Sequence, residues 1–317
     1  MDPISWTPNL STIGFAALSY VTYKLARQAI IYLLPSKLAR YNRTGNNWAL
    51  VTGATDGIGF GFCQELCSRG FNVILHGRNA EKLAKRAQEL NAAFPERNVD
   101  TLILDVIGVD ESIDSVAQQV RDITGNNGKL SILINNVGGE LRTSVTLDTL
   151  TFADVNETID KNARFMTQIT RVLLPLLSEG EGRSGLVLNV SSLSQWGLPY
   201  VSVYSATKGF VDTFTRALEA ECNAEKRGVD VMALRVGQTK TPGYDVDSNL
   251  FVPLPRPLAK AGLDRVGCGE VIVWAYFWHW LQGISFEIMP RWILMRATVA
   301  AMMDMKRKGQ EKALKRQ

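Results

Sequence analysis

The stretch Trp48-Ala-Leu-Val-Thr-Gly-Ala-Thr-Asp-Gly-Ile-Gly59 decides the fold. Its first five residues form a short apolar run that is typical of a buried strand, and a helical pattern begins at its end. Glycines between a strand and a helix permit a tight turn and let backbone N–H groups approach a pyrophosphate closely. The start of the helix adds partial positive charge at the same place. The stretch therefore predicts a dinucleotide-binding turn.

The chain around this turn alternates short apolar runs with longer amphipathic ones. This rhythm favours a parallel sheet with helices on both faces, and the apolar centre of 131–135 fits a strand buried on both sides. Strands are expected at 48–52, 72–76, 101–105, 131–135, 185–190 and 230–236, and helices at 59–68, 81–94, 111–123, 156–177 and 205–225. The predicted fold class is α/β, with a single doubly wound, Rossmann-type parallel sheet.

The chain is expected to have four parts. Residues 1–46 form a hydrophobic leader and residues 47–243 the nucleotide-binding domain. Residues 244–303 hold a proline-rich, apolar loop and an aromatic helical extension, and residues 304–317 form a basic tail. The loop and the aromatic segment behind it are expected to wall an apolar cleft.

Composition excludes several classes of protein. With 317 residues, 46% of them hydrophobic, and a net charge of only +4, the chain is not intrinsically disordered. Its four cysteines form no disulfide framework and its two histidines complete no zinc-ligand spacing, so we expect reduced thiols and no metal. The tail at 304–317 holds six basic and two acidic side chains, which account for the whole net charge. The body therefore lacks the basic excess of a nucleic-acid-binding domain.

Two segments carry membrane signals. Residues 4–23 hold no charge and are followed by Lys24 and further basic residues, so a spanning segment would leave the body in the cytosol. The alternative is an amphipathic leader that packs on the body or lies in the interface. Residues 271–286 are uncharged and aromatic, and a helix there would place Trp274 and Trp278 on one face. Such a face suits a membrane boundary, a core or a dimer interface, and we favour monotopic attachment to a membrane.

The glycine spacing Gly-x3-Gly-x-Gly resembles that of the short-chain dehydrogenase/reductase superfamily. This resemblance covers roughly 47–243 and implies a nucleotide held by the turn. The turn residues expected to bind the cofactor are Gly53, Thr55, Asp56, Gly57, Ile58 and Gly59.

The end of the second strand indicates which nucleotide binds. A site for NAD in this fold carries an acidic residue there for the ribose 2′-hydroxyl, but this chain reads His76-Gly77-Arg78-Asn79. Arg78 can meet a 2′-phosphate with a planar fork of donors, so we expect NADP(H). By resemblance, Asp105 contacts the adenine, and Asn135-Asn136-Val137-Gly138 lies beside the cofactor with Val in place of the family's Ala.

Tyr204 and Lys208 form the expected catalytic pair. Their spacing places a phenol and an ammonium group on one face of a helix. Carbonyl reduction adds a hydride to carbon and a proton to oxygen, and a free tyrosine, with a pKa of about 10, is a poor acid–base group at neutral pH. A nearby ammonium favours the phenolate and lowers that pKa. The motif resembles that of the superfamily, whose lysine also holds the ribose of the cofactor.

The resemblance also implies a serine at a strand end that polarises the substrate carbonyl, thirteen residues before the tyrosine. Counting back from Tyr204 reaches Ser191, whereas matching the end of the strand reaches Ser192. Both remain candidates, and the count favours Ser191. Asn162 resembles the asparagine that sustains a water-linked proton relay to the lysine.

After the sixth strand, Arg235-Val236-Gly237-Gln238-Thr239-Lys240-Thr241 resembles the Pro-Gly segment that closes on the nicotinamide. Val236 stands where the family has Pro, and this puts the rigidity of the loop in doubt. Val236 and Thr239 are the residues of this segment that we expect to contact the cofactor.

Within the superfamily, the motifs at 52–59, 135–138 and 204–212 resemble the microsomal very-long-chain 3-oxoacyl-CoA reductases and related 17β-hydroxysteroid dehydrogenases. This branch implies an NADP(H)-dependent ketoreductase of lipid metabolism with a hydrophobic substrate. The first candidate for that substrate is a 3-oxoacyl-CoA of fatty-acid elongation. Alternatives are a 17β-hydroxysteroid-type or secondary-metabolite ketone reductase or alcohol dehydrogenase, an oxidising steroid dehydrogenase that uses NAD, and a non-catalytic NADP(H)-binding membrane scaffold. The expected partners are the substrate, a membrane surface and a second copy of the chain, without nucleic acid. The expected location is the endoplasmic reticulum membrane with the catalytic domain facing the cytosol, or otherwise the cytoplasm.

Overall fold

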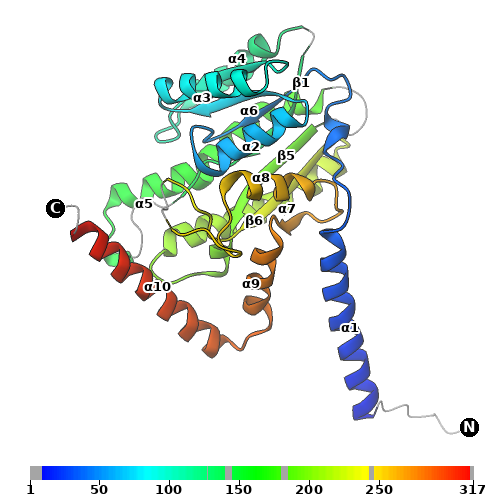
Figure 1. Ribbon diagram of the computed structural model, residues 1–317, viewed down its shortest axis with the longest axis vertical. Coiled ribbons are helices and arrows are strands. Elements are labelled where there is room, and N and C mark those ends of the chain that lie inside the picture. Colours follow the sequence, from blue (N-terminus) through cyan, green and yellow to red (C-terminus); the bar gives the residue numbers. More distant parts are fainter. Residues whose placement is uncertain (1–8, 127, 140–144, 180–184, 243–245, 315–317) are drawn as a thin grey trace, which may run out of the picture.

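Seven parallel strands form one sheet in the order β3-β2-β1-β4-β5-β6-β7 in the computed structural model, which describes residues 9–126, 128–139, 145–179, 185–242 and 246–314 (Figure 1). The strands are β1 (Asn47–Val51), β2 (Asn72–Gly77), β3 (Val99–Ile103), β4 (Lys129–Asn135), β5 (Gly185–Ser192), β6 (Val229–Val236) and β7 (Ile272–Trp274). The chain starts in the middle of the sheet, runs to one edge and returns at β4. The strand order therefore reverses between β1 and β4, where ligands bind in open sheets of this kind.

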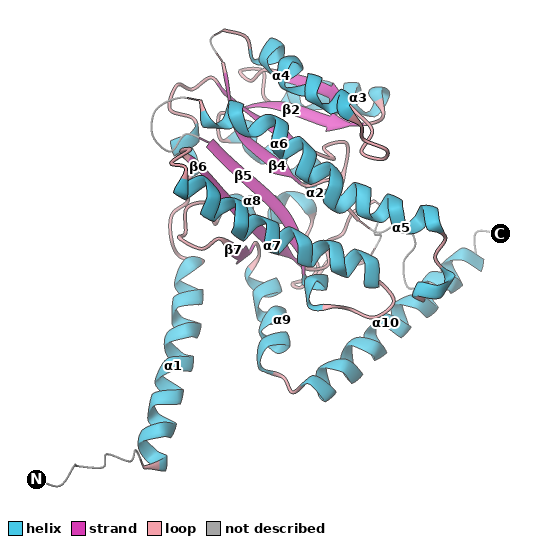
Figure 2. Ribbon diagram, turned by 180° about the vertical axis from the view of Figure 1, so that it is seen from behind, coloured by secondary structure: helices cyan, strands magenta, loops and turns pink. Residues whose placement is uncertain are grey.

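Helices cover both faces of the sheet (Figure 2). They are α2 (Gly57–Ser68), α3 (Ala80–Ala93), α4 (Val116–Thr124), α5 (Phe152–Ile159), α6 (Phe165–Ser178), α7 (Ser202–Ala224) and α8 (Pro255–Asp264). Apolar residues of α2, α3 and α8 form one core with one face of the sheet. Residues of α4, α6 and α7 form a second core on the other face. The predicted fold class is confirmed.

Each of the expected strands and helices forms, with ends shifted by a few residues. Two long helices differ in detail. The expected helix at 156–177 is interrupted by a π-helical turn, Asp160–Arg164, between α5 and α6, and the one at 111–123 begins as a 3₁₀ turn, Glu111–Ser115. The π-helical turn matters for the site because it places Asn162.

The expectation of a helix across 271–286 was wrong in its first part. Ile272–Trp274 is a seventh strand that pairs with β6, and the helix α9 (Phe277–Ile288) begins only after it. Trp274 and Trp278 therefore do not share a helix face. The β-branched pair Ile272-Val273 favours a strand, and the edge of β6 provides backbone partners for it.

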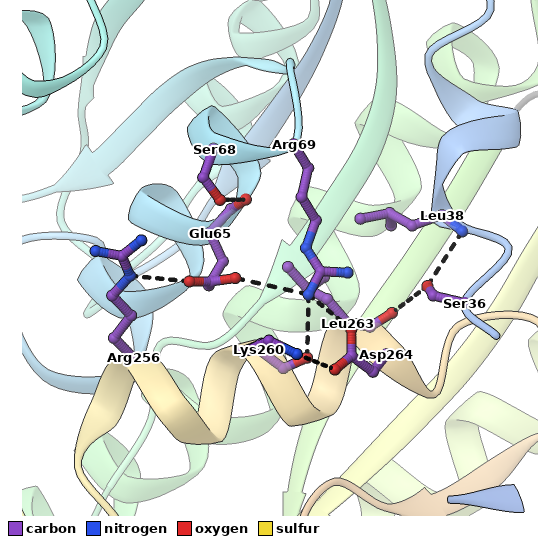
Figure 3. A network of polar contacts seen from close by, with 9 residues as sticks. All are labelled: Ser36, Leu38, Glu65, Ser68, Arg69, Arg256, Lys260, Leu263 and Asp264. Atoms are coloured by element: carbon purple, nitrogen blue, oxygen red, sulfur yellow. Dashed lines mark hydrogen bonds and ion pairs between the residues drawn. The ribbon is translucent and has the colours of Figure 1, made fainter. Parts of the chain in front are cut away.

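Helix α8 is held to α2 by a chain of ion pairs (Figure 3). Arg69, the residue that follows α2, donates to Asp264 at 2.7 Å, and Arg256 of α8 donates to Glu65 of α2 at 2.8 Å. The two helices also approach closely, because a Cβ at Gly61 would lie 2.9 Å from the carbonyl of Pro255. The end of the loop that follows β6 is thus anchored to the helix that starts at the glycine turn.

Three further helices extend from the sheet body. Helix α1 (Leu10–Ile31) projects away from it, and α9 and α10 (Arg291–Leu314) extend on the same side (Figure 1). The carboxyl end of α1 meets the body at Tyr32, whose hydroxyl donates to the carbonyl of Trp274 at 3.1 Å. Among the described residues, none of the helices combines the length and the apolar content that crossing a bilayer requires.

Candidate active site

A cleft of about 400 Å³ opens at the carboxyl edge of the sheet, beside the point where the strand order reverses. Eleven of the site residues expected from the sequence line it: Gly53, Asp56, Gly57, Ile58, Asn136, Ser191, Ser192, Tyr204, Lys208, Val236 and Thr239. Six others lie outside its lining: Thr55, Gly59, Arg78, Asp105, Asn135 and Asn162. The structure thus brings the glycine turn, the Tyr–Lys pair and the segment after β6 to one cleft.

The glycine turn has the geometry of a phosphate cradle. Gly53 and Gly57 have φ of +64° and +54°, a region that favours glycine. A Cβ at Gly59 would lie 2.2 Å from the carbonyl oxygen of Gly53, so a side chain there would block the turn. The Asp56 carboxylate accepts from the Gly57 N–H at 2.8 Å. In the described part of the chain, no acceptor takes the N–H of Ile58, which remains available to an anion in the cleft.

Two adjacent asparagines hold the carboxyl end of β4. The side-chain amide of Asn136 donates to the carbonyl of Thr52 at 2.9 Å, and the Thr52 hydroxyl accepts from the N–H groups of Asn136 and Val137. The buried amide of Asn135 donates to Thr170 and to Asn189. Asn136 therefore ties the glycine turn to β4 at the cleft, whereas the side chain of Asn135 belongs to the core beneath it.

Arg78 and Asp105 follow the ends of β2 and β3, and Thr55, in the glycine turn after β1, lies against the end of β2, where a Cβ at Gly77 would be 2.9 Å from its methyl group. Arg78 is exposed, and within the described ranges it forms no ion pair. Burial, together with the nearby Arg78 guanidinium, lowers the pKa of Lys161. Two cations therefore lie near each other on this side, an arrangement that fits a phosphate group.

Tyr204 and Lys208 lie on α7 with their side chains together. The Lys208 ammonium is 5.6 Å from the centre of the Tyr204 ring and donates to the carbonyl of Val190 at 2.8 Å. Lys208 is only 4% exposed. Burial lowers the pKa of Lys208 to about 8, the carboxylate of Asp212 opposes this shift, and Lys161 adds to it.

The ion pair behind Lys208 explains how a buried cation is tolerated. Asp212 lies one turn further along α7 and is 2% exposed. Its carboxylate accepts from Arg235 of β6 at 2.8 and 2.9 Å. Negative charge at this position raises the pKa of Lys208 against the effect of burial and so favours its ammonium form.

The two candidate serines differ in access to the cleft. Ser191 is fully buried, and its hydroxyl has no hydrogen-bond partner among the described residues. Ser192, the last residue of β5, is half-buried, and its hydroxyl accepts from the N–H of Ser194 at 3.2 Å. The Ser192 oxygen already accepts one hydrogen bond, and its hydroxyl hydrogen can still be donated to a group in the cleft.

Asn162 lies in the π-helical turn, and such turns often occur at functional sites. Its side chain accepts from the Gly139 N–H at 2.9 Å and donates to the Gly139 and Thr158 carbonyls at 3.0 and 2.8 Å. A Cβ at Gly138 would lie 2.8 Å from the Asn162 oxygen and 3.3 Å from the Lys208 nitrogen. Asn162 therefore fixes the segment 138–139 against Lys208.

Both histidines hold backbone groups of the cleft, a role that their sequence context does not reveal. His76 accepts from the N–H of Gly53 at 3.3 Å, and His279 accepts from the N–H of Gly237 at 3.0 Å. Each ring thus holds a glycine that lines the cleft. Their rarity in the chain was the available signal, and although His76 stands in the segment that was used to choose the nucleotide, no role was predicted for its side chain.

Aromatic side chains lie on segments that adjoin the cleft-lining residues Ser192 and Gln238, and we call this aromatic cluster the mouth of the cleft. Trp196, which follows the candidate serines, stacks on Phe286 of α9, and Phe251 contacts Trp278 of α9 edge to face. Trp196 and Phe251 are 41% and 37% exposed. Helix α10 closes the other side, because Met305 meets the cleft residue Gln238 at 3.6 Å. The surroundings fit an apolar substrate better than a charged one.

In the ranges that the structure describes, no group of three or more His, Cys, Asp or Glu side chains is arranged to hold a metal ion. The described cysteines Cys63, Cys67, Cys222 and Cys268 are free thiols, and the first three are buried.

Known proteins resemble this chain over most of its length. The profile of a family described as short chain dehydrogenase matches residues 47–248. Two relatives named very-long-chain 3-oxoacyl-CoA reductase, from Mus musculus and Rattus norvegicus, are 31% and 30% identical, each over 90% of this chain and over 88% and 89% of their own length. A short-chain dehydrogenase from Sphingobium yanoikuyae, solved in complex with NADPH, has a similar fold with a TM-score of 0.61, at 24% identity over 77% of this chain and 95% of that one.

Proposed function

The chain belongs to the short-chain dehydrogenase family, and from this premise we propose that it is an NADP(H)-dependent ketoreductase of lipid metabolism. One observation carries the proposal: the Tyr204 phenol and the Lys208 ammonium line the same cleft as the glycine turn. A phenol beside a cation, within a nucleotide cleft, supplies the proton that reduction of a carbonyl requires.

The residues present fit a phosphorylated dinucleotide. Positive φ at Gly53 and Gly57, and the close approach behind Gly59, leave room for a pyrophosphate against the start of α2. We assign the pyrophosphate to Gly57 and Ile58 and the 2′-phosphate to Arg78. The remaining contacts assigned to the cofactor come from Gly53, Thr55, Asp56, Gly59, Asp105, Asn136, Tyr204, Lys208, Val236 and Thr239. Asn135 supports this set from the core.

The chemistry divides between the cofactor and three side chains. NADPH, when bound, supplies the hydride for the carbonyl carbon. Tyr204 gives its proton to the carbonyl oxygen and becomes a phenolate, which the Lys208 ammonium stabilises. Ser192 donates a hydrogen bond to the same oxygen and so favours the charge that develops on it. Asn162 keeps the segment 138–139 in place beside Lys208.

For the substrate we propose a 3-oxoacyl thioester with a long acyl chain. The aromatic mouth formed by Trp196, Phe251 and Phe286 supports an apolar chain. The relatives named very-long-chain 3-oxoacyl-CoA reductase support the thioester. A steroid ketone is the second candidate, because the same apolar walls would hold a fused ring system.

A substrate panel tests this function. Detergent-solubilised protein is mixed with NADPH and with 3-oxoacyl-CoA esters of increasing chain length, steroid ketones or no ketone, and the nicotinamide absorbance is followed. We expect turnover that rises with acyl chain length. NADPH binding without turnover of any ketone would favour a binding scaffold instead, and faster turnover with NADH would contradict the assigned cofactor.

The variant Arg78→Asp tests the cofactor choice. We expect the ratio of kcat/KM for NADPH to that for NADH to fall about 10- to 100-fold, because charge-assisted hydrogen bonds to the 2′-phosphate are lost. Lys85→Asp, which makes the same change of charge on an exposed position of α3, is the matched control. An unchanged ratio in Arg78→Asp would remove Arg78 from the phosphate site.

We also propose that the protein attaches to one face of the endoplasmic reticulum membrane, with its catalytic body in the cytosol. Helix α1 exposes apolar residues along its length, among them Phe15 at 74% and Leu18 at 66%. The turn between α9 and α10 exposes Ile288 and Trp292 on the same side of the body (Figure 1). Lys24 near the body suits the anionic cytosolic surface, whereas Arg27 forms an ion pair with Glu270 at 2.5 Å.

Vesicle flotation tests the attachment. Full-length protein should float with phosphatidylcholine–phosphatidylserine vesicles, and the double variant Ile288→Glu, Trp292→Glu should lower the floated fraction about fivefold or more, since burial of two apolar side chains is lost. Ile103→Glu is the control, because this exposed isoleucine lies on β3 at the opposite edge of the sheet. Equal flotation of all three proteins would contradict a contact at the α9–α10 turn.

A further inference from the structure

His279 of α9 joins two loops that border the cleft. Its Nδ1 accepts from the N–H of Gly237 at 3.0 Å, and its Nε2 lies 3.1 Å from the carbonyl oxygen of Gln238 and 3.2 Å from that of Phe251. Because Nδ1 is an acceptor here, the ring proton lies on Nε2, which donates to the two carbonyls. One fully buried imidazole thus satisfies three backbone groups.

We propose that His279 is a positioning residue, which holds segment 236–239 in the shape that receives the nicotinamide end of the cofactor and fixes Phe251 at the substrate mouth. This inference rests on the proposed function, since it assigns a task to the same cleft. Val236, Gly237, Gln238 and Thr239 all line that cleft. His279 itself does not line it and acts through the backbone that does.

Segment 237–240 needs such support because it has no regular secondary structure of its own. Leaving a buried backbone donor or acceptor without a partner costs about 1–3 kcal/mol, so the loop would rearrange without the imidazole. The imidazole of His279 lies so close to Gly237 that no side chain fits there, because a Cβ at Gly237 would be 2.8 Å from the ring. The Thr239 hydroxyl donates to the Gly237 carbonyl at 3.4 Å, so its position follows that of Gly237.

Packing around α9 fixes the imidazole in turn. A Cβ at Gly283 would lie 2.1 Å from the ring of Trp274, so α9 rests directly on β7. The rings of Tyr276 and His279 pack edge to face with their centres 5.3 Å apart, and the rings of Trp278 and Phe251 do so with their centres 5.6 Å apart. The C-terminal extension is therefore part of the cleft's framework, which the motifs at 47–243 would not reveal.

The charge state suits this role. Burial lowers the pKa of His279 to about 4, and hydrogen bonds to Gln238 and Phe251 oppose the shift. At neutral pH the ring is therefore neutral, as an acceptor at Nδ1 requires. At the other loop the Nδ1 of His76 likewise accepts from the N–H of Gly53, and burial lowers the pKa of His76 to about 4, but its Nε2 bridges no carbonyl groups in the described part of the chain.

Three variants separate positioning from mere packing. His279→Asn keeps an acceptor near the place of Nδ1, His279→Gln keeps a donor near that of Nε2, and His279→Phe fills the space without hydrogen bonds. Leu281→Ala, at an exposed position of α9, is the control. The readouts are amide hydrogen exchange at 237–239 without nucleotide, the Kd for NADPH from its fluorescence, and the thermal midpoint.

We expect His279→Phe to raise exchange at 237–239 and the Kd for NADPH about tenfold or more, with KM for NADPH rising more than kcat falls. His279→Asn should restore protection of Gly237 and bring the Kd within about threefold of the wild-type value. Wild-type exchange and affinity in His279→Phe would overturn the inference, as would equal losses in the Asn, Gln and Phe variants. If His279→Phe does not fold, the inference is tested by the Asn and Gln variants, and equal losses in these two would overturn it. Failure of the wild type to bind NADPH would contradict the proposed function instead.

Discussion

Tyr204→Phe is expected to lower kcat for carbonyl reduction about 10²- to 10⁴-fold, the range that general acid catalysis contributes. The substitution removes one hydroxyl and keeps the ring that lies near the Lys208 ammonium. The glycine turn and Arg78 are untouched, so the affinity for NADPH should stay within about threefold of the wild-type value. The loss should therefore appear in turnover and not in cofactor binding.

Steady-state turnover and NADPH fluorescence on the same preparation check this prediction. Ser202→Ala, at an exposed position of α7 in the turn before Tyr204, is the control and should keep full activity. Retained activity in Tyr204→Phe would reject the phenol as the proton donor. A loss of NADPH binding that matches the loss of turnover would show that Tyr204 acts through the cofactor alone.

Ser192→Ala is expected to lower kcat about 10²- to 10³-fold, as expected for the loss of one donor to a developing oxyanion. Ser191→Ala should lower it less than about fivefold, because the Ser191 hydroxyl is buried and bonds to no described residue. The two serines are adjacent on β5 and the substitutions are chemically identical. Each variant is therefore the other's control.

The kcat values of both variants, measured with a saturating ketone, distinguish the two serines. A larger loss in Ser191→Ala would favour the residue reached by counting back from Tyr204 and would mean that the end of β5 rearranges when substrate binds. Similar small losses in both would remove the serine from the mechanism.

The parts of the fold that sequence predicts well are those with local causes. The glycine turn is readable because Gly53 and Gly57 adopt positive φ that other residues avoid. The Tyr204–Lys208 pair is readable because helix geometry alone brings residues four apart together. Both signals lie within a few residues of chain.

The parts that sequence did not predict depend on distant partners. Strand β7 is three residues long and pairs with the edge of β6, and its uncharged, aromatic surroundings concealed the strand preference of Ile272 and Val273 within a longer helical pattern. Helix α8 is held by Arg69 and Glu65, which lie about 190 residues earlier in the chain. His279 meets Gly237 across 42 residues. No local pattern encodes such contacts.

The serine question shows the same limit at the scale of one residue. Side chains on a strand alternate between the two faces, so a shift of one position exchanges a buried hydroxyl for an accessible one. Between the two serines and Tyr204 the chain forms a 3₁₀ turn, Leu193–Trp196. The sequence does not fix the length of this connection, so counting residues does not decide between Ser191 and Ser192. The difference in burial between the two hydroxyls is the ground on which we propose Ser192, and the count alone favoured Ser191.

Transfer of deuterium tests the central claim most directly. Wild-type protein is incubated with a 3-oxoacyl-CoA and NADPH that carries deuterium at both C4 positions, and the product is analysed by mass spectrometry. We predict one deuterium on the carbon that bears the new hydroxyl, and about 10²- to 10⁴-fold less of this labelled product per unit time with Tyr204→Phe. A reduced product without deuterium, or no reduced product from any lipophilic ketone, would contradict hydride transfer in this cleft.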